Sequence, residues 1–122
     1  MKQSGYIAVS GGARGLGRAV VDYFLEIGHC VLVVDLNPQP LDPLLTQYGD
    51  CLLAVQASVL DTDLLTDALA QAKQKWGPVR GVVNCAGVAP AQRVIGRDGL
   101  MPLADFERAI SINLTGSFNL TR

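Results

Sequence analysis

Ser10-Gly11-Gly12-Ala13-Arg14-Gly15-Leu16-Gly17 is the stretch that decides the fold. It follows the apolar run 6–9, which predicts a strand, and it opens a segment with helical periodicity at residues 15–27. At such a junction, free backbone N–H groups and the positive end of a helix dipole can hold a pyrophosphate. Gly11 permits the tight turn, Gly15 lets the backbone approach the phosphate, and Gly17 lets the helix pack close to the sheet.

An acidic residue stands where a dinucleotide site needs one. Asp35 lies eighteen residues after Gly17 and ends the β-branched run 30–34, which predicts a strand buried on both faces. Its carboxylate can accept hydrogen bonds from the hydroxyls of an adenosine ribose. The structural alternative is that the glycines only make a turn and that Asp35 only caps a loop.

The remaining pattern alternates short apolar runs with helical segments. Further strands are predicted at 51–55 and 80–84, with helices to about Tyr48, from Asp61 to Trp76, and from about Pro102. Residues 87–101 are predicted to be irregular. This order predicts a doubly wound α/β fold of Rossmann type, with a parallel sheet in strand order 3-2-1-4 and a single dinucleotide-binding domain over residues 1–122. The apolar helix faces are predicted to be Leu16, Ala19, Val20, Tyr23, Phe24 and Ile27; Leu64, Leu65, Ala68, Leu69, Ala72 and Trp76; and Leu103, Phe106, Ile110, Leu114 and Phe118.

Composition excludes several classes of function. The 122 residues are 49% hydrophobic and 17% charged with a net charge of −1, which is typical of a globular domain and gives no basic surface for nucleic acid or an anionic membrane. One histidine, His29, and three cysteines without a CxxC pair predict no metal site, and we expect Cys30, Cys51 and Cys85 to be reduced thiols. The N-terminal apolar run is too short for a leader or a membrane span. We therefore expect the cytoplasm, or else the mitochondrial matrix.

Three motifs resemble the short-chain dehydrogenase/reductase family. They are GxxxGxG after Ser10, Asn84-Cys85-Ala86-Gly87, which is similar to the family's Asn-Asn-Ala-Gly, and Asn113 in Ile-Asn-Leu-Thr-Gly. The resemblance implies that Asn113 is a catalytic residue that helps to hold a proton-relay water. Ser58 stands where the family often has an adenine-binding Asp, and we expect it to make a weaker contact. The predicted cofactor-binding residues are Ser10, Gly11, Arg14, Gly15, Leu16, Gly17, Asp35, Ser58, Asn84, Ala86 and Gly87.

The choice of cofactor rests on two residues of opposite charge. Arg14 is a feature of NADP-preferring members of the family, whereas the carboxylate of Asp35 would repel a 2′-phosphate. No Arg or Lys directly follows Asp35 to offset that charge. We therefore expect NAD, with NADP as the less favoured alternative.

The family's remaining catalytic residues are absent from this sequence. Residues four positions after Tyr6, Tyr23 and Tyr48 are Ser, Ile and Leu, so there is no Tyr-x-x-x-Lys. We expect the chain to be truncated before the catalytic Ser, Tyr and Lys, and to be inactive alone. The fourth strand would then be an open edge and the last helix would expose Phe118 and Leu120, which predicts a homo-oligomer.

Within the family, residues 84–122 are similar to type II 3-hydroxyacyl-CoA dehydrogenases, also called 17β-hydroxysteroid dehydrogenase type 10. The resemblance implies hydride transfer between nicotinamide and a secondary alcohol, such as a 3-hydroxyacyl-CoA. A non-catalytic dinucleotide-binding sensor and a structural fragment that binds nothing stay open as alternatives. A downstream Tyr-x-x-x-Lys would favour the enzyme.

Overall fold

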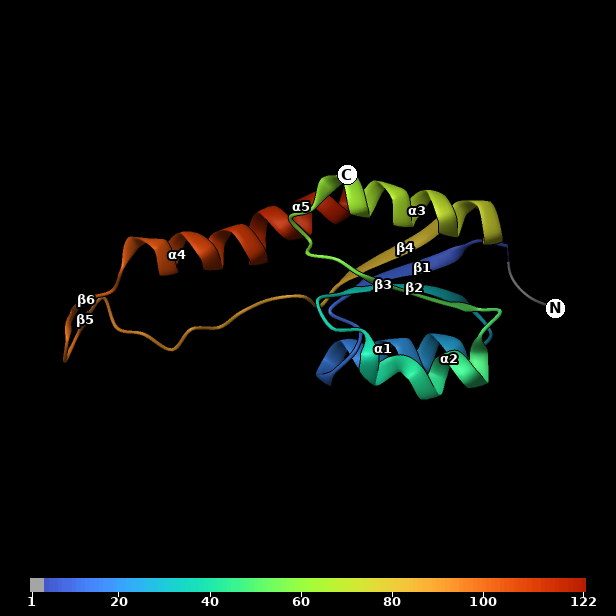
Figure 1. The fold of residues 1–122 in the computed structure, drawn as a ribbon, viewed down its shortest axis with the longest axis horizontal. Helices are drawn as coiled ribbons and strands as arrows, with labels where there is room; N and C mark the ends of the chain where they lie inside the picture. The colour runs from blue at the N-terminus through green and yellow to red at the C-terminus, as the bar shows by residue number, and fades with distance from the viewer. Residues whose placement is uncertain (1–3) are drawn as a thin grey trace.

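The computed structural model describes residues 4–122, which form a four-stranded parallel sheet in the predicted order β3-β2-β1-β4 (Figure 1). Residues 1–3, which begin the segment predicted not to be a leader, lie outside the described part. The strands run in close register, because Ser10 pairs with both Val34 and Asn84, and Asp35 pairs with Gln56. Their carboxyl ends therefore lie at one edge of the sheet. The strands are β1 (Tyr6–Ser10), β2 (Cys30–Asp35), β3 (Leu52–Gln56) and β4 (Val79–Asn84).

Helices cover both faces of the sheet (Figure 1). Alternation along β1 and β2 sends successive side chains to opposite faces, and each face has its own core. One core contains Ile7 and Val9 with residues of α1 and α2, and the other contains Ala8 and Leu32 with residues of α3 and α5. The helices are α1 (Gly15–Glu26), η1 (Gln39–Leu41), α2 (Asp42–Tyr48), α3 (Thr62–Trp76) and α5 (Gly116–Thr121).

The predicted apolar face of α1 was right only in part, because Val20 and Phe24 pack against the core but are only partly buried. Gly17, Val21 and Leu25 are the buried residues of this helix, whereas Leu16 and Tyr23 are 85% and 58% exposed. Apolar residues surround most of the helix, so their spacing does not single out one face. The contact that decides the rotation is made by Gly17, because a Cβ there would overlap the carbonyl oxygen of Gly11. A helix that rests on Gly17 also buries the residues one and two turns further along.

The predicted boundaries and the α3 face agree closely with the structure. Asp61 caps α3 by accepting a hydrogen bond from the Leu64 N–H at 3.1 Å. Leu65, Ala68 and Ala72 are buried, although Leu64 is exposed. The third and fourth strands begin at Leu52 and Val79, one residue away from the predicted starts.

At the far end of the sheet, the hydroxyl of Tyr6 donates to the Leu69 carbonyl at 3.2 Å, and burial raises the pKa of this phenol.

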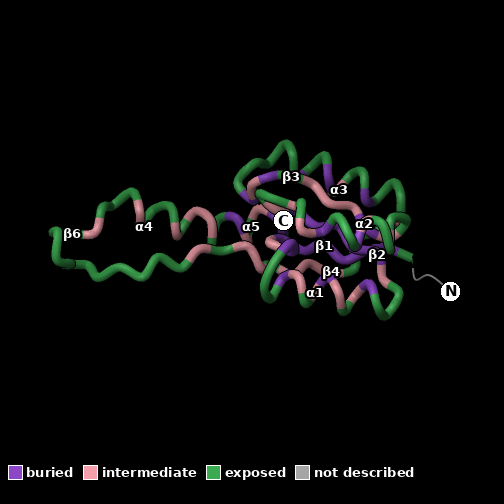
Figure 2. The backbone as a smooth tube through the Cα atoms, turned by 60° about the horizontal axis from the view of Figure 1, so that its bottom comes forward, coloured by how far each residue is buried: buried purple, intermediate pink, exposed green. Residues whose placement is uncertain are grey.

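Residues 88–115, here called the arm, extend away from the sheet (Figure 1). The stretch predicted to be irregular contains a small antiparallel pair, and the last helix includes a π-helical turn at its centre. No residue of the arm is buried, as the exposed and intermediate colours of Figure 2 show. The prediction for Leu120 was wrong, because this residue is 3% exposed and packs under α3, whereas Phe118 is exposed as predicted. The elements are β5 (Ile95–Gly96), β6 (Gly99–Leu100), α4 (Leu103–Ile110) and η2 (Ser111–Thr115).

No helix within residues 4–122 has the length and apolar character needed to cross a bilayer.

Candidate dinucleotide-binding groove

A groove of about 260 Å³ lies at the carboxyl edge of the sheet. Each strand contributes the residues that follow its last sheet position, and the arm closes one side. The crevice beyond the carboxyl ends of parallel strands is where open α/β sheets bind their ligands. The lining residues are Gly11; 34–36; 57–59; 85–88; and Arg108 and Ile112 of the arm.

The glycine turn combines close packing with an unusual backbone conformation. A Cβ on Gly11 would lie 2.7 Å from the Ala86 nitrogen, so the turn packs directly against the loop after β4. Gly15 has a φ of +57° and no atom within 4 Å of an ideal Cβ. The positive φ favours glycine, and the open space leaves the first turn of α1 accessible to a ligand. The N–H groups of that turn have no acceptor within the helix, which suits them to bind an anion.

Asp35 fastens two loops at the mouth of the groove. Its Oδ2 accepts a hydrogen bond from the Ala13 N–H, and its Oδ1 accepts one from the Asn37 N–H, each at 3.0 Å. A carboxylate has about four acceptor sites, so both oxygens can still accept from a ligand. Asp35 therefore positions the glycine turn in addition to presenting a negative charge.

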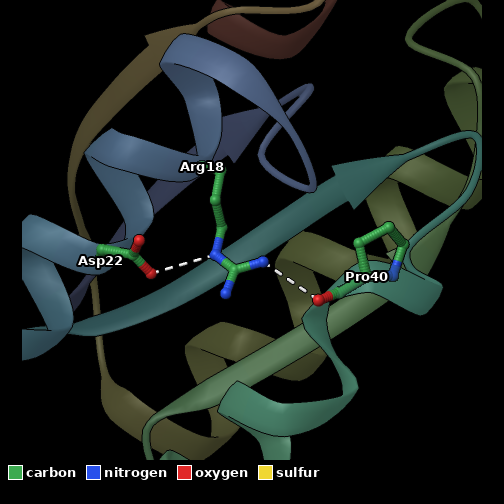
Figure 3. A network of polar contacts seen from close by, with 3 residues as sticks. All are labelled: Arg18, Asp22 and Pro40. Atoms are coloured by element: carbon green, nitrogen blue, oxygen red, sulfur yellow. Dashed lines mark hydrogen bonds and ion pairs between the residues drawn. The ribbon is translucent and has the colours of Figure 1, made fainter.

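The connection between α1 and the β2–α2 loop is reinforced by Arg18 (Figure 3). Its Nε donates to Asp22 Oδ1 at 3.1 Å, and its Nη1 donates to the Pro40 carbonyl at 3.0 Å. The pair with Asp22 is partly exposed, with side chains 29% and 42% accessible, so water screens it. The hydrogen bond to the Pro40 carbonyl has the larger structural consequence, because it holds the loop after β2 beside α1.

The loop after β4 is held from two sides. The buried hydroxyl of Ser10 accepts a hydrogen bond from the Ala86 N–H at 3.2 Å. On the other side, Asn113 makes a paired contact with Val88: its Oδ1 accepts from the Val88 N–H and its Nδ2 donates to the Val88 carbonyl, both at 2.8 Å. Asn113 lies in the π-helical turn, and such turns are frequent at functional sites.

The structure brings some of the predicted residues together and separates others from the groove. Gly11, Asp35, Ser58, Ala86 and Gly87 line it. Arg14, Gly15, Leu16 and Gly17 lie at the start of α1 outside the lining, and Ser10 and Asn113 support the loop from behind. Asn84 points toward α5, where its Nδ2 donates to the Thr121 hydroxyl at 3.1 Å.

Eight lining residues were missed by the sequence reasoning: Val34, Leu36, Ala57, Val59, Cys85, Val88, Arg108 and Ile112. Leu36 and Val59 directly follow polar residues that the motifs did identify, so their positions could have been inferred. Arg108 had no local signal, because it reaches the groove from α4, which is distant in sequence from the strand ends. Arg108 adds a positively charged side chain to the groove that contains the Asp35 carboxylate, although no Arg or Lys directly follows Asp35 in the sequence. Within residues 4–122, no cluster of three metal-ligating side chains occurs.

Comparison with known proteins agrees with this geometry. The model of the short chain dehydrogenase family matches residues 6–122. The chain belongs to the short-chain dehydrogenase family. The family membership that the three motifs predicted is therefore confirmed.

Curated relatives in this short-chain dehydrogenase family include the 3-hydroxyacyl-CoA dehydrogenase type-2 of Drosophila melanogaster, 35% identical over 93% of this chain and 46% of that protein. The human protein of the same name is 34% identical over 97% of this chain and 46% of its own length. The chain spans about half the length of the curated relatives it matches.

Solved structures of the family superimpose well on the chain. The 3-hydroxyacyl-CoA dehydrogenase type-2 from Mycobacterium avium has a TM-score of 0.87 at 30% identity, over 99% of this chain and 48% of that one. A short-chain dehydrogenase/reductase from Brucella melitensis has a TM-score of 0.84 at 27% identity, over 99% of this chain and 52% of that one.

Proposed function

We propose that this chain is the NAD-binding half of a short-chain dehydrogenase that oxidises a secondary alcohol, with a 3-hydroxyacyl-CoA as the substrate class. The observation that carries the proposal is the arrangement of the groove and the turn beside it. Gly11 and Asp35 line the groove, and the Asp35 carboxylate accepts a hydrogen bond from the Ala13 N–H, in the glycine turn that leads into α1. The likeness to 3-hydroxyacyl-CoA dehydrogenases supports the substrate class. Substrate choice also depends on residues beyond this half, so the substrate is the finer part of the proposal.

The residues fit a dinucleotide in a consistent order. The pyrophosphate would lie against the backbone of Gly15, Leu16 and Gly17, where the open space above Gly15 gives it room. Asp35 would accept hydrogen bonds from the adenosine ribose, and Ser58 would contact the adenine. Ala86 and Gly87 would lie along the ribose, with Ser10 and Asn84 supporting the loop that carries them.

NAD is the proposed cofactor rather than NADP. A 2′-phosphate would add a doubly charged group beside the Asp35 carboxylate, where repulsion is poorly screened. Arg14 is exposed at the start of α1 and Arg108 reaches the groove from the arm, and both would partly offset that repulsion. The carboxylate is the better placed of these charges for a ribose, because it is fixed by two backbone N–H groups.

Chemistry would require residues that this sequence does not contain. When bound, the nicotinamide accepts a hydride from the alcohol carbon, and a general base takes the hydroxyl proton. Asn113 would be this chain's catalytic contribution, since it fixes the loop beside the reacting groups through its paired contact with Val88. Without a Tyr-x-x-x-Lys, residues 1–122 alone are proposed to bind the cofactor but not to turn over.

The proposal extends to assembly and compartment. An apolar stripe of exposed residues runs along the arm into α5, and exposure of these side chains to water is unfavourable in free energy. We propose that copies associate through this stripe and that the protein works in the cytoplasm or the mitochondrial matrix. The stripe consists of Leu103, Phe106, Ile110, Leu114 and Phe118.

The deciding experiment changes one charge in the groove. Asp35→Asn keeps the shape and one acceptor oxygen, so the glycine turn can keep its Ala13 contact. We expect the dissociation constant for NADH to rise about tenfold, because the charge-assisted hydrogen bonds to the ribose are lost. The ratio of the NADPH to the NADH dissociation constant should fall, because the repulsion between the carboxylate and the 2′-phosphate is lost as well. Fluorescence titration of the reduced cofactors measures both values. Substitution by Ser or Arg would be harder to interpret, since either removes the tie to Ala13.

The matched control is Asp67→Asn, which removes the same charge from an exposed position on α3, across the sheet from α1. Its effect on both dissociation constants should lie within error. Equal affinities of the wild type and Asp35→Asn for NADH would show that Asp35 does not bind the ribose. Absence of any NADH binding by the wild-type protein would favour the structural alternative, and binding without alcohol oxidation by the complete natural gene product would favour the sensor.

A further inference from the structure

Two cysteines meet at the edge of the sheet opposite the groove. Cys30 is the first residue of β2, and Cys51 immediately precedes β3. Val31 pairs with Leu52, so the two cysteines are neighbours one step earlier in the same parallel register. The Val31 N–H donates to the Cys51 carbonyl at 2.8 Å, which fixes the two backbones side by side. The pair is therefore positioned by the sheet and not by a flexible loop.

The two side chains point toward each other. Their sulfur atoms lie 2.8 Å apart, and the three cysteines of the chain are present as thiols. Neighbouring strands are spaced by about 4.8 Å, which falls within the range of Cα separations that a disulfide bridges. Formation of a bond between these sulfurs would require only side-chain movement.

The two thiols differ in their access to a reagent. Cys51 is half-buried and lines a surface hollow formed by residues 46–51 at the end of α2. Cys30 is 3% exposed and packs within the core on the α3 side of the sheet. A reagent from solvent would therefore meet Cys51 first, and the Cys30 sulfur would lie beside the product. Cys85, the third cysteine, lies in the loop after β4 and lines the groove.

We propose that Cys30 and Cys51 form a reversible dithiol–disulfide site oxidised by peroxides. The Cys51 thiolate attacks a peroxide oxygen, the O–O bond breaks, and Cys51 becomes a sulfenic acid as the first water departs. The Cys30 sulfur then attacks the Cys51 sulfur, an S–S bond forms, and the hydroxyl leaves as the second water. Two thiols and one hydrogen peroxide thus give one disulfide and two waters. A small-molecule dithiol returns both cysteines to thiols by exchange.

The consequence of oxidation is a closed loop around the ribose-binding segment. The cysteines are 21 positions apart, and the chain between them carries the rest of β2, Asp35 and α2. A cross-link constrains the unfolded chain, so the oxidised protein should melt several degrees higher than the reduced one. Asp35 lies five residues along β2, about 16 Å from Cys30, so cofactor binding is expected to be unaffected. The site does not depend on the proposed function.

The test uses hydrogen peroxide and intact-mass spectrometry on the purified protein. After brief oxidation, the wild type should lose about 2 Da, and digestion should yield a peptide that joins Cys30 to Cys51. Cys85→Ser should behave identically, since it leaves the pair intact. Cys51→Ser should lose no mass and should show no melting shift on oxidation. Cys30→Ala should instead accumulate oxygen on Cys51, because no thiol remains to resolve it.

Several results would overturn the proposal. Added oxygen on Cys51 of the wild type without loss of 2 Da would mean that Cys30 does not resolve the sulfenic acid. A cross-link through Cys85, or one between two chains, would assign the reactivity to another pair. If either variant fails to fold, the wild-type peptide map still decides, because a Cys30–Cys51 peptide is either recovered or not.

Discussion

The central strands and the arm both carry apolar side chains in a regular pattern but differ in what surrounds them. In β1 and β2, every residue from Tyr6 to Ser10 and from Cys30 to Val34 is buried, with helices on both faces. In the arm, no residue is buried, although Leu103, Phe106 and Ile110 follow a clear helical spacing. Apolar periodicity thus marks a surface that can be covered, and only the rest of the fold decides whether it is covered within this chain.

The comparison predicts that equivalent changes should have very different costs in the two regions. The sheet and its helices are close-packed and cannot yield without loss of contacts. The arm is surrounded by solvent, so a side chain there can change without creating a cavity or an overlap.

The largest effect is expected for Gly17→Val. A side chain at this position would overlap the Gly11 carbonyl, which belongs to the turn on which α1 rests. We expect a loss of about 4 kcal/mol or more in the free energy of unfolding, because backbone has to move to relieve the overlap. Urea denaturation followed by circular dichroism measures this loss, and NADH titration should show no binding.

The matched glycine in the arm is Gly96. A Cβ there would lie 3.7 Å from the Gly99 oxygen, which is an ordinary contact. Gly96→Ala should therefore change the unfolding free energy by less than about 0.5 kcal/mol. Similar costs at Gly17 and Gly96 would show that the close approach of α1 to the turn is not a determinant of stability.

An intermediate effect is expected for Leu32→Ala. Leu32 is fully buried in the central strand β2, so its removal leaves a cavity and should cost about 3 kcal/mol. Leu114→Ala makes the same chemical change at a residue that is 65% exposed, and its cost should stay below about 0.5 kcal/mol. Thermal or urea unfolding at low protein concentration compares the pair. A large loss from Leu114→Ala in a monomeric sample would mean that the arm packs against the sheet in solution.

The same contrast explains what could be predicted from the sequence. The apolar run 30–34 is typical of a strand covered on both faces, and the alternation of strands and helices favours the observed sheet order, so the fold could be predicted from local patterns. The face of α1 could be predicted only in part, because the deciding contact is made by Gly17, which has no side chain to give a hydrophobic signal. Leu120 was predicted to be exposed because the packing of α5 under α3 is a long-range contact.

The candidate site divides in the same manner. Gly11, Asp35 and Ala86 stand at a strand end or within two residues of one, and the sheet brings strand ends together. Arg108 reaches the groove from a helix that is distant in sequence, and no local pattern announces it. The sequence also did not predict that Asp35 accepts hydrogen bonds from the backbone N–H groups of Ala13 and Asn37. Nearly every residue type has a backbone N–H, so the identities of Ala13 and Asn37 do not indicate these contacts.

The smallest effect on stability, and the most informative one for the arm, is expected when its stripe is made polar. Phe106→Ser combined with Phe118→Ser removes two exposed rings, 54% and 65% accessible, without touching either core. The unfolding free energy of the monomer should change by about 0.5 kcal/mol at most. The wild type should associate as its concentration rises, because the stripe is buried only between copies, and the double variant should remain monomeric at the same concentrations. Light scattering at several concentrations measures both.

Tyr23→Ser removes an aromatic ring that is 58% exposed on α1, outside the stripe, and should leave association unchanged. A wild type that is monomeric throughout would contradict the proposed association, and a double variant that still associates would assign the interface to another surface, such as the open edge of β4.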